Sequence, residues 1–416
     1  MRVVHVLRKL DPAEWGGTET AIERLCGGLR EHGVESVLYC PRIAHAIKDD
    51  PLVRAGHEVQ RFNAFVPVLG ISPERKRQMI AVGGNLLSFD LVSSLLCENT
   101  ASVVHSHALG RIGGIALMVA RQRRLPFVVT IHGGVLDLPH RLKLEFNQSL
   151  KQGWDWGRLF GLLFHSHRLF RDADAILTCN EKEADLLRER YPSKSIVVQP
   201  HGVPTAAYES DCRDAARASF PQIRGRQLLL NVGRIDPVKN QAWLVEQSSE
   251  IFRRFPETIL VLAGPCTDEA YGESIRTRIA ALGLQERILL TGGFGSSDPR
   301  LIGLMQQARA LILCSISETF GLVLLEGWAA GTVVLASQTS GAKALVEQGK
   351  NGWLFDLENA AEFHDALAAV LNDPVRGKDM SERGKQLVLN RYSVSALAGR
   401  LKTLYQALIE ERQCAT

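Results

Sequence analysis

The 416-residue chain lacks three features that would each point to a special class of protein. Its eight cysteines include no CxxC pair, which favours reduced thiols in a cytoplasm. No uninterrupted apolar stretch is long enough to span a bilayer, so any membrane contact has to be peripheral. A net charge of only +4 gives no sign of a dedicated nucleic-acid binder.

The N-terminal run of residues 1–7 also lacks the length of a secretory signal, because Arg8 and Lys9 follow it directly. We therefore expect this run to be the first strand of a cytoplasmic protein. With 45% hydrophobic and 23% charged residues, the chain has the composition of an ordinary globular protein. Its length exceeds what one core usually serves, so two domains with a cleft between them are expected.

Short β-branched runs alternate with amphipathic helical patterns, which is typical of an α/β protein with parallel sheets and crossover helices. Residues 205–226 hold no strand-like run, and a fresh series begins at residue 227, so the predicted domains are 1–205 and 206–392. We predict strands at residues 3–7, 36–39, 58–62, 102–105, 127–131, 175–178 and 196–199 in the first domain, and at 227–232, 258–263, 287–291, 309–314, 332–336 and 353–355 in the second.

Ligands of open parallel sheets bind beyond the carboxyl ends of the strands, so the loops that follow the predicted strands matter most. After the first strand, Gly16 and Gly17 open a helix and let backbone amides approach a phosphate, although a simple tight turn explains the pair equally well. After the fifth strand, His132 precedes two glycines and could contact a sugar hydroxyl. An ordinary surface histidine fits the local pattern as well.

Two cations follow the first strand of the second domain, Arg234 and Lys239 within GRIDPVKN. Across the turn they can converge on one anion, and together they would neutralise a diphosphate. The alternative is a solvated charge pair at the start of a helix. Because cations oppose the helix dipole at that end, the pattern favours a bound anion.

Two glutamates stand in SISETFGLVLLEGWAAG, where an apolar strand runs through a loop into a helix. Glu318 is predicted on the loop at the carboxyl end of the strand. Glu326 is predicted about one turn inside a helix that is apolar nearly all round. A buried carboxylate is costly unless it is paired, and a hydroxyl-rich ligand would satisfy it; a hydrogen bond to a neighbouring loop is the alternative.

Taken together, these segments resemble glycosyltransferase family 4, and the resemblance covers almost the whole chain. Glu318 and Glu326 match the family signature E-x7-E, GRIDPVKN looks like its basic diphosphate motif, and PHGV at residues 200–203 looks like its interdomain segment. The resemblance implies the GT-B fold, with two facing Rossmann-like domains and a cleft between them. It also implies that the last helix, residues 393–412, packs back on the first, acceptor-binding domain, while the second domain binds the donor.

The resemblance implies a role for each candidate residue. Glu318 would bind hydroxyls of the transferred sugar, and Glu326 would bind the ribose of the nucleotide. Arg234 and Lys239 would hold the diphosphate, and His132 would lie over the sugar near the reacting carbon. The donor site would be completed, largely by backbone amides, at Gly16, Gly17, Phe320, Gly321, Leu322 and Val323.

The resemblance further implies a retaining transfer of a hexose-type sugar from a UDP- or GDP-linked donor to an acceptor hydroxyl, in glycan, glycolipid or small-molecule glycoside synthesis. No cofactor and no metal are expected. The DxD match at residues 172–174 precedes a strand where the family has a structural ADA segment. The alternating pairs His105 with His107 and His165 with His167 lack carboxylate or thiolate partners at metal spacing.

Two departures from the family pattern leave the nucleobase open. Cys314 stands where the family has a proline, and residues 292–297 are glycine-rich where the base would lie. The acceptor is equally open. Residues 138–171 can lie on an anionic membrane or receive an anionic acceptor, although a helix that packs on its own domain is the alternative. This segment mixes basic and aromatic residues, namely Arg141, Lys143, Lys151, Arg158, Arg168 and Arg171 with Trp154, Trp156, Phe160 and Phe164.

Other functions are compatible with parts of the pattern. A non-hydrolysing nucleotide-sugar epimerase has a similar fold but needs further acidic residues for proton transfer at the sugar. A non-catalytic sugar-nucleotide-binding protein would not need Arg234, Lys239, Glu318 and Glu326 together. A dinucleotide dehydrogenase would need a G-x-G-x-x-G between an early strand and a helix, which the sequence lacks. The oligomeric state is left open.

Overall fold

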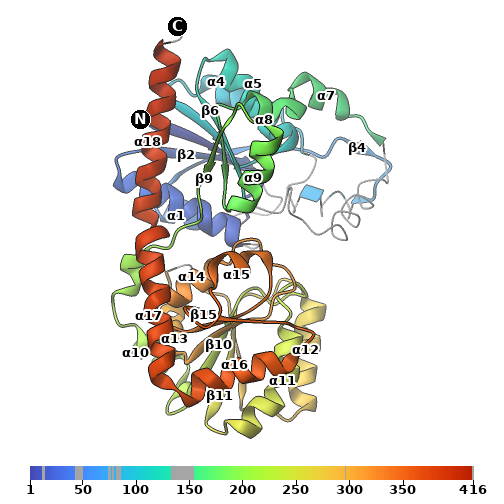
Figure 1. The fold of residues 1–416 in the computed structure, drawn as a ribbon. Coiled ribbons are helices and arrows are strands. Elements are labelled where there is room, and N and C mark those ends of the chain that lie inside the picture. Colours follow the sequence, from blue (N-terminus) through green and yellow to red (C-terminus); the bar gives the residue numbers. More distant parts are fainter. Residues whose placement is uncertain are drawn as a thin grey trace. The chain divides into compact units, whose positions relative to one another are not determined.

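The computed structural model describes residues 1–11, 15–42, 50–73, 76, 79–80, 86–132, 154–295 and 297–414. The chain divides into two compact units, one of Met1–Pro200 with Ser395–Thr416 and one of His201–Val394 (Figure 1). Each unit contains a parallel sheet between helices, so the predicted class of two Rossmann-like α/β domains is confirmed. The units part between residues 200 and 201 rather than between 205 and 206.

The first unit is built on a seven-stranded sheet in the order β3-β2-β1-β5-β6-β8-β9, with every paired strand parallel. Because β1 lies between β2 and β5, the strand order reverses beside β1, and this is where ligands bind in open sheets. The strands are β1 (Arg2–Val6), β2 (Glu35–Pro41), β3 (Glu58–Phe62), β5 (Val103–Ser106), β6 (Phe127–Ile131), β8 (Ala175–Thr178) and β9 (Ser195–Val198).

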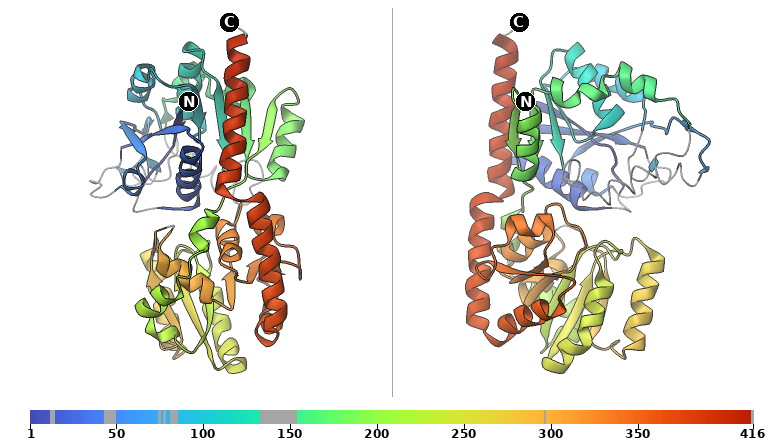
Figure 2. Two further views of the ribbon diagram at one scale, coloured as in Figure 1. Left: turned by 90° about the vertical axis from the view of Figure 1, so that its left-hand side faces the viewer. Right: turned by 45° about the vertical axis from the view of Figure 1, so that its right-hand side comes forward.

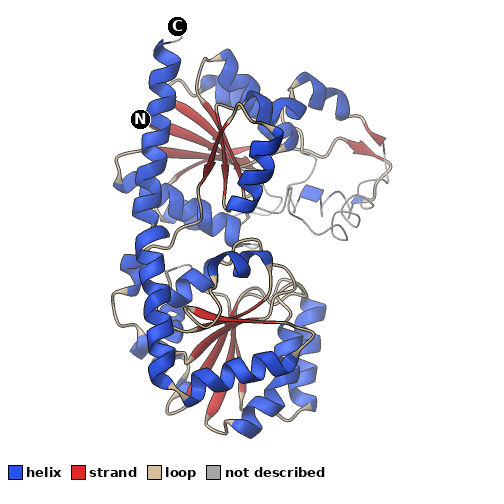
Figure 3. Ribbon diagram, viewed as in Figure 1, coloured by secondary structure: helices blue, strands red, loops and turns tan. Residues whose placement is uncertain are grey.

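Helices cover both faces of this sheet (Figure 3). Adjacent residues of β1 serve opposite faces, as the period of a strand requires: Val4 packs in one core and Val3 in the other. The described helices of the unit are α1 (Gly17–Glu31), α2 (Pro51–Arg54), α4 (Asp90–Cys97), α5 (Gly110–Gln122), α7 (Arg158–Leu163), α8 (Leu169–Asp172), α9 (Glu181–Arg190) and α18 (Val394–Cys414).

The last helix packs on the first unit, as predicted. In α18, Ala398, Leu401, Tyr405 and Leu408 recur with helical spacing and join Val3 in one core. The far end of the helix is held by a salt bridge from Arg412 to Asp174, at 2.7 Å. Asp174 also accepts the Phe127 N–H, at 2.7 Å, so this acid of the DxD match is engaged in holding strands and helix together.

The second unit has a six-stranded parallel sheet in the order β12-β11-β10-β13-β14-β15, with helices on both faces (Figure 2). The strand order reverses beside β10, between β11 and β13. The strands are β10 (Gln227–Val232), β11 (Thr258–Ala263), β12 (Ile288–Gly292), β13 (Ala310–Leu313), β14 (Val334–Ser337) and β15 (Gly352–Phe355). The helices are α10 (Arg213–Ser219), α11 (Gln241–Arg254), α12 (Glu269–Ala281), α13 (Pro299–Gln307), α14 (Leu322–Ala329), α15 (Ser340–Leu345), α16 (Ala360–Asn372) and α17 (Pro374–Arg391).

Glycines let α14 pack closely on two neighbours. A Cβ at Gly327 would lie 2.6 Å from the side chain of Leu311 in β13, so only a glycine allows the helix this near the sheet. On its other side α14 contacts α17, where a Cβ at Gly384 would lie 2.1 Å from the ring of Trp328. The position of α14, and of the loop before it, is therefore fixed by packing on both sides.

Candidate functional site

The carboxyl ends of β10 and β13 bring together the two charged loops that the sequence singled out. Arg234 and Lys239 lie on the loop after β10, and Glu318 lies on the loop after β13. Lys239 Nζ donates to Glu318 Oε2 at 2.5 Å, with both side chains mostly buried. The backbone joins the loops as well, because the N–H of Ile316 donates to the carbonyl of Val238 at 2.9 Å.

The two cations of the first loop each pair with a carboxylate. Arg234 reaches Asp236 at 3.0 Å and is partly exposed, whereas Lys239 is bound to Glu318. The structure therefore does not place both cations against one common anion. The loop itself makes a close turn: a Cβ at Gly264, whose φ is +157°, would lie 1.9 Å from the carbonyl oxygen of Gly233. Backbone of two neighbouring loops meets here without side chains between.

The loop that carries Glu318 is held by its backbone. The carbonyl of Glu318 accepts the N–H of Gly341 at 2.8 Å and the hydroxyl of Ser340 at 3.2 Å, both at the start of α15. The hydroxyl of Ser337 donates to the carbonyl of Ser315 at 2.6 Å. A Cβ at Gly341 would lie 2.6 Å from the backbone nitrogen of Phe320, so the loop and α15 are in direct backbone contact.

Cys314, where the sequence departs from the family pattern, is buried and links two neighbouring segments of the site. Its thiol is fully buried and donates to the carbonyls of Lys239, at 3.4 Å, and Asn240, at 3.3 Å. Burial raises the pKa of this thiol to about 12, so it remains protonated at neutral pH. The cysteine thus ties the end of β13 to the loop of Lys239.

Helix α14 starts directly after the Glu318 loop. Gly321 stands before its first residue with φ +87°, a conformation that favours glycine. The predicted amides of Leu322 and Val323 occupy the first two helical positions, where N–H groups have no carbonyl partner within a helix and the dipole favours an anion. The loop before α14 contacts the loop that carries Lys239. One anion can therefore bind both Lys239 and the N-terminal amides of α14.

The side chains of this segment differ in burial. Glu326 was expected to be buried, but it is only partly buried, because the apolar residues of α14 leave one side uncovered. Phe320, in contrast, is only 6% exposed and packs its ring against His201 and Tyr392. Only the backbone of Phe320 is thus left for a ligand.

In the first unit, the predicted glycine pair forms the start of α1. Gly16 precedes the helix and Gly17 begins it. The N–H of Gly16 donates to the carboxylate of Glu19 at 3.1 Å, so this amide is already engaged by an acid of the same helix. Trp15 is fixed beside it by a hydrogen bond from its ring nitrogen to Thr20, at 2.9 Å.

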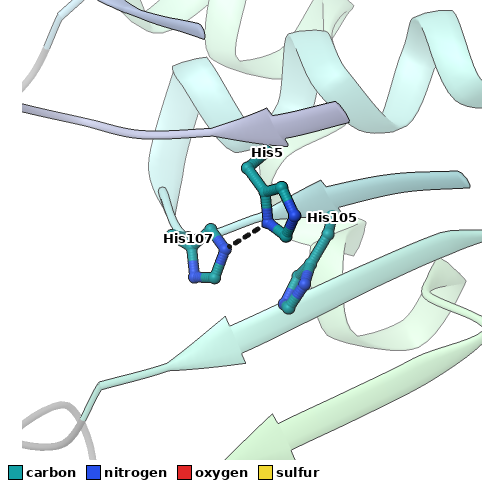
Figure 4. A group of neighbouring side chains, drawn as sticks. All are labelled: His5, His105 and His107. Atoms are coloured by element: carbon teal, nitrogen blue, oxygen red, sulfur yellow. Dashed lines mark hydrogen bonds between the residues drawn. The ribbon is translucent and has the colours of Figure 1, made fainter. Parts of the chain in front are cut away.

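His132 follows β6 and belongs to a cluster of imidazoles that the sequence did not predict. Its Nε2 lies 2.9 Å from Nδ1 of His107, and Nε2 of His107 lies 3.0 Å from Nδ1 of His5 (Figure 4). His105 stands beside them. The signal that could have found the cluster is topological, since β1 and β5 flank the reversal of strand order and carry His5 and His105 in register. The glycines at 133 and 134 lie outside the described residues.

The basic aromatic segment is not one helix. Residues 138–153 lie outside the described residues, and the rest forms the short strand β7 (Trp154–Asp155), paired with β4 (Val68–Leu69), and short helices from α7 to α8. Its inner aromatics Trp156, Phe160 and Phe164 pack on the core of the first unit. Its outer apolar side chains are exposed, namely Trp154 (70%), Leu159 (75%), Leu162 (62%) and Leu163 (62%). Among the described residues, no helix has the length and apolarity needed to cross a membrane.

Two family models match the chain in succession. "Glycosyltransferase Family 4" matches residues 15–207, and "Glycosyl transferases group 1" matches residues 213–387. The second range contains all six strands of its sheet, and the first contains the seven-stranded sheet except β1. The charged loops after β10 and β13 lie in the second range, and the start of α1, His107 and His132 lie in the first.

Curated proteins and solved structures resemble the chain over much of its length. A D-inositol 3-phosphate glycosyltransferase of Nocardia farcinica is 31% identical over 68% of this chain, which spans 61% of that protein. One of Corynebacterium glutamicum is 25% identical and covers 95% of this chain and 92% of its own length. The structure of Anabaena HepE in complex with UDP-glucose has a TM-score of 0.72 at 15% identity, with 98% of this chain and all of that chain covered.

Proposed function

Because the chain is a glycosyltransferase of the GT-B fold, we propose that it transfers a hexose-type sugar from a nucleoside-diphosphate sugar to an acceptor hydroxyl, with retention and without a bound metal. The observation that carries the proposal is the contact of Lys239 with Glu318 at the strand reversal beside β10, next to the start of α14. A cation, an acid and the N-terminal amides of a helix therefore lie on loops that contact each other. The cation and the amides suit a diphosphate, and the acid suits the hydroxyls of a sugar.

The proposed roles follow the charges. Lys239 and Arg234 meet the diphosphate together with the amides of Leu322 and Val323, and supply the positive charge that the leaving diphosphate requires. Glu318 accepts hydrogen bonds from sugar hydroxyls, and its contact with Lys239 holds it in place. Glu326 binds the ribose. Its partial exposure supports this role, because a ligand can reach it from solvent.

Retention fits a site that stabilises charge rather than one that supplies a base. In a retaining transfer of this kind, the acceptor attacks on the face from which the diphosphate leaves, and a phosphate oxygen takes the acceptor's proton. The protein then contributes positioning and stabilisation of the leaving group. In the second unit, Lys239, Arg234 and the start of α14 supply that stabilisation, so the proposal needs no metal.

The comparisons suggest which substrates to test first. HepE was solved with UDP-glucose, which makes UDP-linked sugars the first donors, followed by GDP-linked ones. The curated relatives are named for D-inositol 3-phosphate, which makes a phosphorylated polyol the first acceptor to test. The first unit, which contains His132 and the start of α1, is the proposed acceptor side.

A donor screen tests this proposal directly. The purified chain is incubated with UDP-, GDP- and ADP-sugars, with and without acceptors, in buffer with EDTA or with Mg²⁺, and nucleotide release and product anomer are followed by NMR. We expect release of nucleoside diphosphate that rises with acceptor, an unchanged anomer, and equal rates in EDTA. Formation of an epimer without release of nucleotide would instead identify an epimerase. An inverted product or a strict need for metal would contradict the mechanism.

We also propose that the exposed leucines of α7 touch an anionic lipid surface. Leu159, Leu162 and Leu163 are the exposed apolar side chains of α7, and the basic side chains Arg158 and Arg171 flank them in the chain and are exposed too. A short apolar face with cations at its ends inserts between anionic headgroups. This contact would bring the acceptor side of the enzyme to a membrane.

The membrane proposal predicts that replacing Leu159, Leu162 and Leu163 with serine reduces binding to vesicles of phosphatidylglycerol and phosphatidylcholine at least about tenfold, because three apolar insertions are lost. Flotation at low salt measures it. Val375→Ser, which changes an exposed apolar residue of the second unit, is the matched control and should bind as wild type does. Wild-type protein that fails to float at low salt would refute the contact.

A further inference from the structure

Lys239 is held in its loop by the side chain and at both ends of its backbone. The stem lies across the end of β10, where a Cβ at Gly233 would be 3.5 Å from Lys239 Cδ, and the ammonium ends at Glu318. The backbone N–H donates to the carboxylate of Asp236 at 3.0 Å. The carbonyl oxygen lies 3.4 Å from the sulfur of Cys314. The position of this cation therefore depends on several residues besides its ion-pair partner.

The backbone that follows Lys239 has an unusual conformation. Asn240 stands before the first residue of α11 with φ +56°, in the left-handed region, and its side chain does not cap the helix. Residues at this position are ordinarily extended and cap the helix with their side chains. A left-handed residue other than glycine costs free energy and persists where its surroundings hold it. The turn from Asp236 to Asn240 therefore needs support from neighbouring segments.

The thiol of Cys314 supplies such support. Its sulfur lies 3.4 Å from the carbonyl oxygen of Lys239 and 3.3 Å from that of Asn240, so one proton is shared between two successive peptides. Burial raises the pKa of this thiol to about 12, which keeps the proton on the sulfur at neutral pH. The carbonyl of Asn240 also accepts the N–H of Trp243 at 3.1 Å. For the carbonyl of Lys239, the thiol is the one donor that the described part of the chain offers.

Asn231, a buried residue of β10, determines where the thiol proton points. Its Nδ2 donates to the carbonyl of Ile312 at 2.8 Å and approaches the sulfur of Cys314 at 3.9 Å. An amide N–H directed at the sulfur makes the sulfur the acceptor of that contact, so the thiol proton is left for the carbonyls of the other loop. Proline, the family's residue at this position, has no donor group. The link is therefore a property of this chain rather than of the family pattern.

We propose that Cys314 is a positioning residue of the donor site, which holds the carbonyl of Lys239 and thereby keeps the ammonium in place for the diphosphate. The inference rests on the proposed function, which places Lys239 beside the diphosphate. Without the thiol, the turn from Asp236 to Asn240 gains freedom, and Lys239 has to be ordered when the diphosphate binds. This ordering lowers the affinity for the diphosphate group.

Ligand binding to the full-length chain tests the proposal without turnover. Calorimetry measures the Kd of UDP, of GDP and of inorganic pyrophosphate, which has no base. We expect Cys314→Ala to weaken the binding of pyrophosphate, and of UDP or GDP, whichever the wild type binds, by about fivefold, as the loss of one buried hydrogen bond does. Cys314→Ser retains a donor and should bind within about twofold of the wild type. If Cys314→Ala does not fold, Cys314→Val, which fills the site without a donor, takes its place.

The Lys239→Ala background separates positioning from a general loss of structure. In that background there is no ammonium to position, so adding Cys314→Ala should leave the Kd unchanged. A merely structural effect would weaken binding in both backgrounds. Cys212→Ala is the matched control and should bind as the wild type does. Cys212 stands before α10, with its N–H bonded to the side chain of Gln306 just before β13, and so belongs to the opposite end of the sheet.

Three results would each overturn the proposal: wild-type affinity in folded Cys314→Ala, an equal loss in Cys314→Ser, or a further loss when Cys314→Ala is added to Lys239→Ala. Thermal unfolding checks that each variant is folded. Binding is read without an acceptor, so a chain that shows the expected affinities but transfers no sugar would sink the proposed function and leave this inference standing. Sugar transfer by the wild type together with unchanged affinity in Cys314→Ala would overturn the inference alone.

Discussion

Lys239→Ala and Glu318→Gln are each expected to lower kcat/KM by about 30-fold or more, which corresponds to about 2 kcal/mol of transition-state stabilisation. In the proposed mechanism, Lys239 supplies charge where the diphosphate leaves, and Glu318 holds the sugar hydroxyls. Glutamine keeps the shape of Glu318 and removes its charge. Initial rates with the donor found in the screen, over a range of donor concentrations, measure both variants.

The contact between these two residues adds a sharper expectation. Since Lys239 Nζ and Glu318 Oε2 are 2.5 Å apart, each residue positions the other, and the double variant should cost clearly less than the sum of the single ones. Lys350→Ala is the matched control, because Lys350 forms a 2.9 Å pair with Glu347 that is largely exposed in the same unit. Near-wild-type turnover in either single variant, or strict additivity, would contradict the roles assigned to the pair.

Most of the fold could be predicted because each buried parallel strand has a recognisable local sequence pattern. The buried runs of β6, β8, β10 and β11 have the bounds that the sequence predicts, since strands covered on both faces are nearly continuous apolar runs. The short pair β4 and β7 was missed, as two-residue strands leave no periodic signal.

The site could be predicted only as far as loop positions go. Placing Arg234, Lys239 and Glu318 after strands of one parallel sheet was enough to expect them along one edge, because the carboxyl ends of parallel strands meet there. The sequence did not predict which charges pair. In the structure, Lys239 forms an ion pair with Glu318, and Arg234 forms one with Asp236. The burial of Glu326 was misjudged since hydrophobic neighbours along a helix do not show which side its partners cover.

The histidine cluster could not be predicted either, because its members are distant in the sequence. His105 and His107 were noticed in the sequence and set aside because no acid or thiolate accompanies them at metal spacing. Their partners, His5 and His132, are far away in the chain and meet them only through strand order and register. Neutral imidazoles can satisfy one another, so the absence of acids said nothing against a network.

Acid is expected to destabilise the first unit well before its carboxylates are protonated. Burial lowers the pKa of His5 to about 3, with a smaller contribution from His57, and burial likewise holds the pKa of His105 well below 6.5, with His5 and His132 adding to it. Both rings are neutral in the folded chain. In the unfolded chain they take up protons near pH 6.5, so folding stability is full above that pH and falls as pH decreases toward about 3.

Between pH 7 and pH 5, the loss of folding stability caused by His5 should be about 2 kcal/mol, out of a total stability of about 5 to 15 kcal/mol, and His105 adds to this loss in the same direction. Hydrogen exchange of β1 and β5, with labelling times scaled to the intrinsic rate at each pH, measures this. This window excludes Glu98, whose pKa is lowered from 4.5 and whose effect therefore begins at lower pH.

The control compares the pH dependence of protection in a His5 variant with that in the wild type. His5→Asn removes one titrating ring, so its loss of protection between pH 7 and pH 5 should be smaller than that of the wild type by about 2 kcal/mol, whatever its stability at pH 7. Equal pH dependence in the two proteins would mean that His5 is charged in the folded chain.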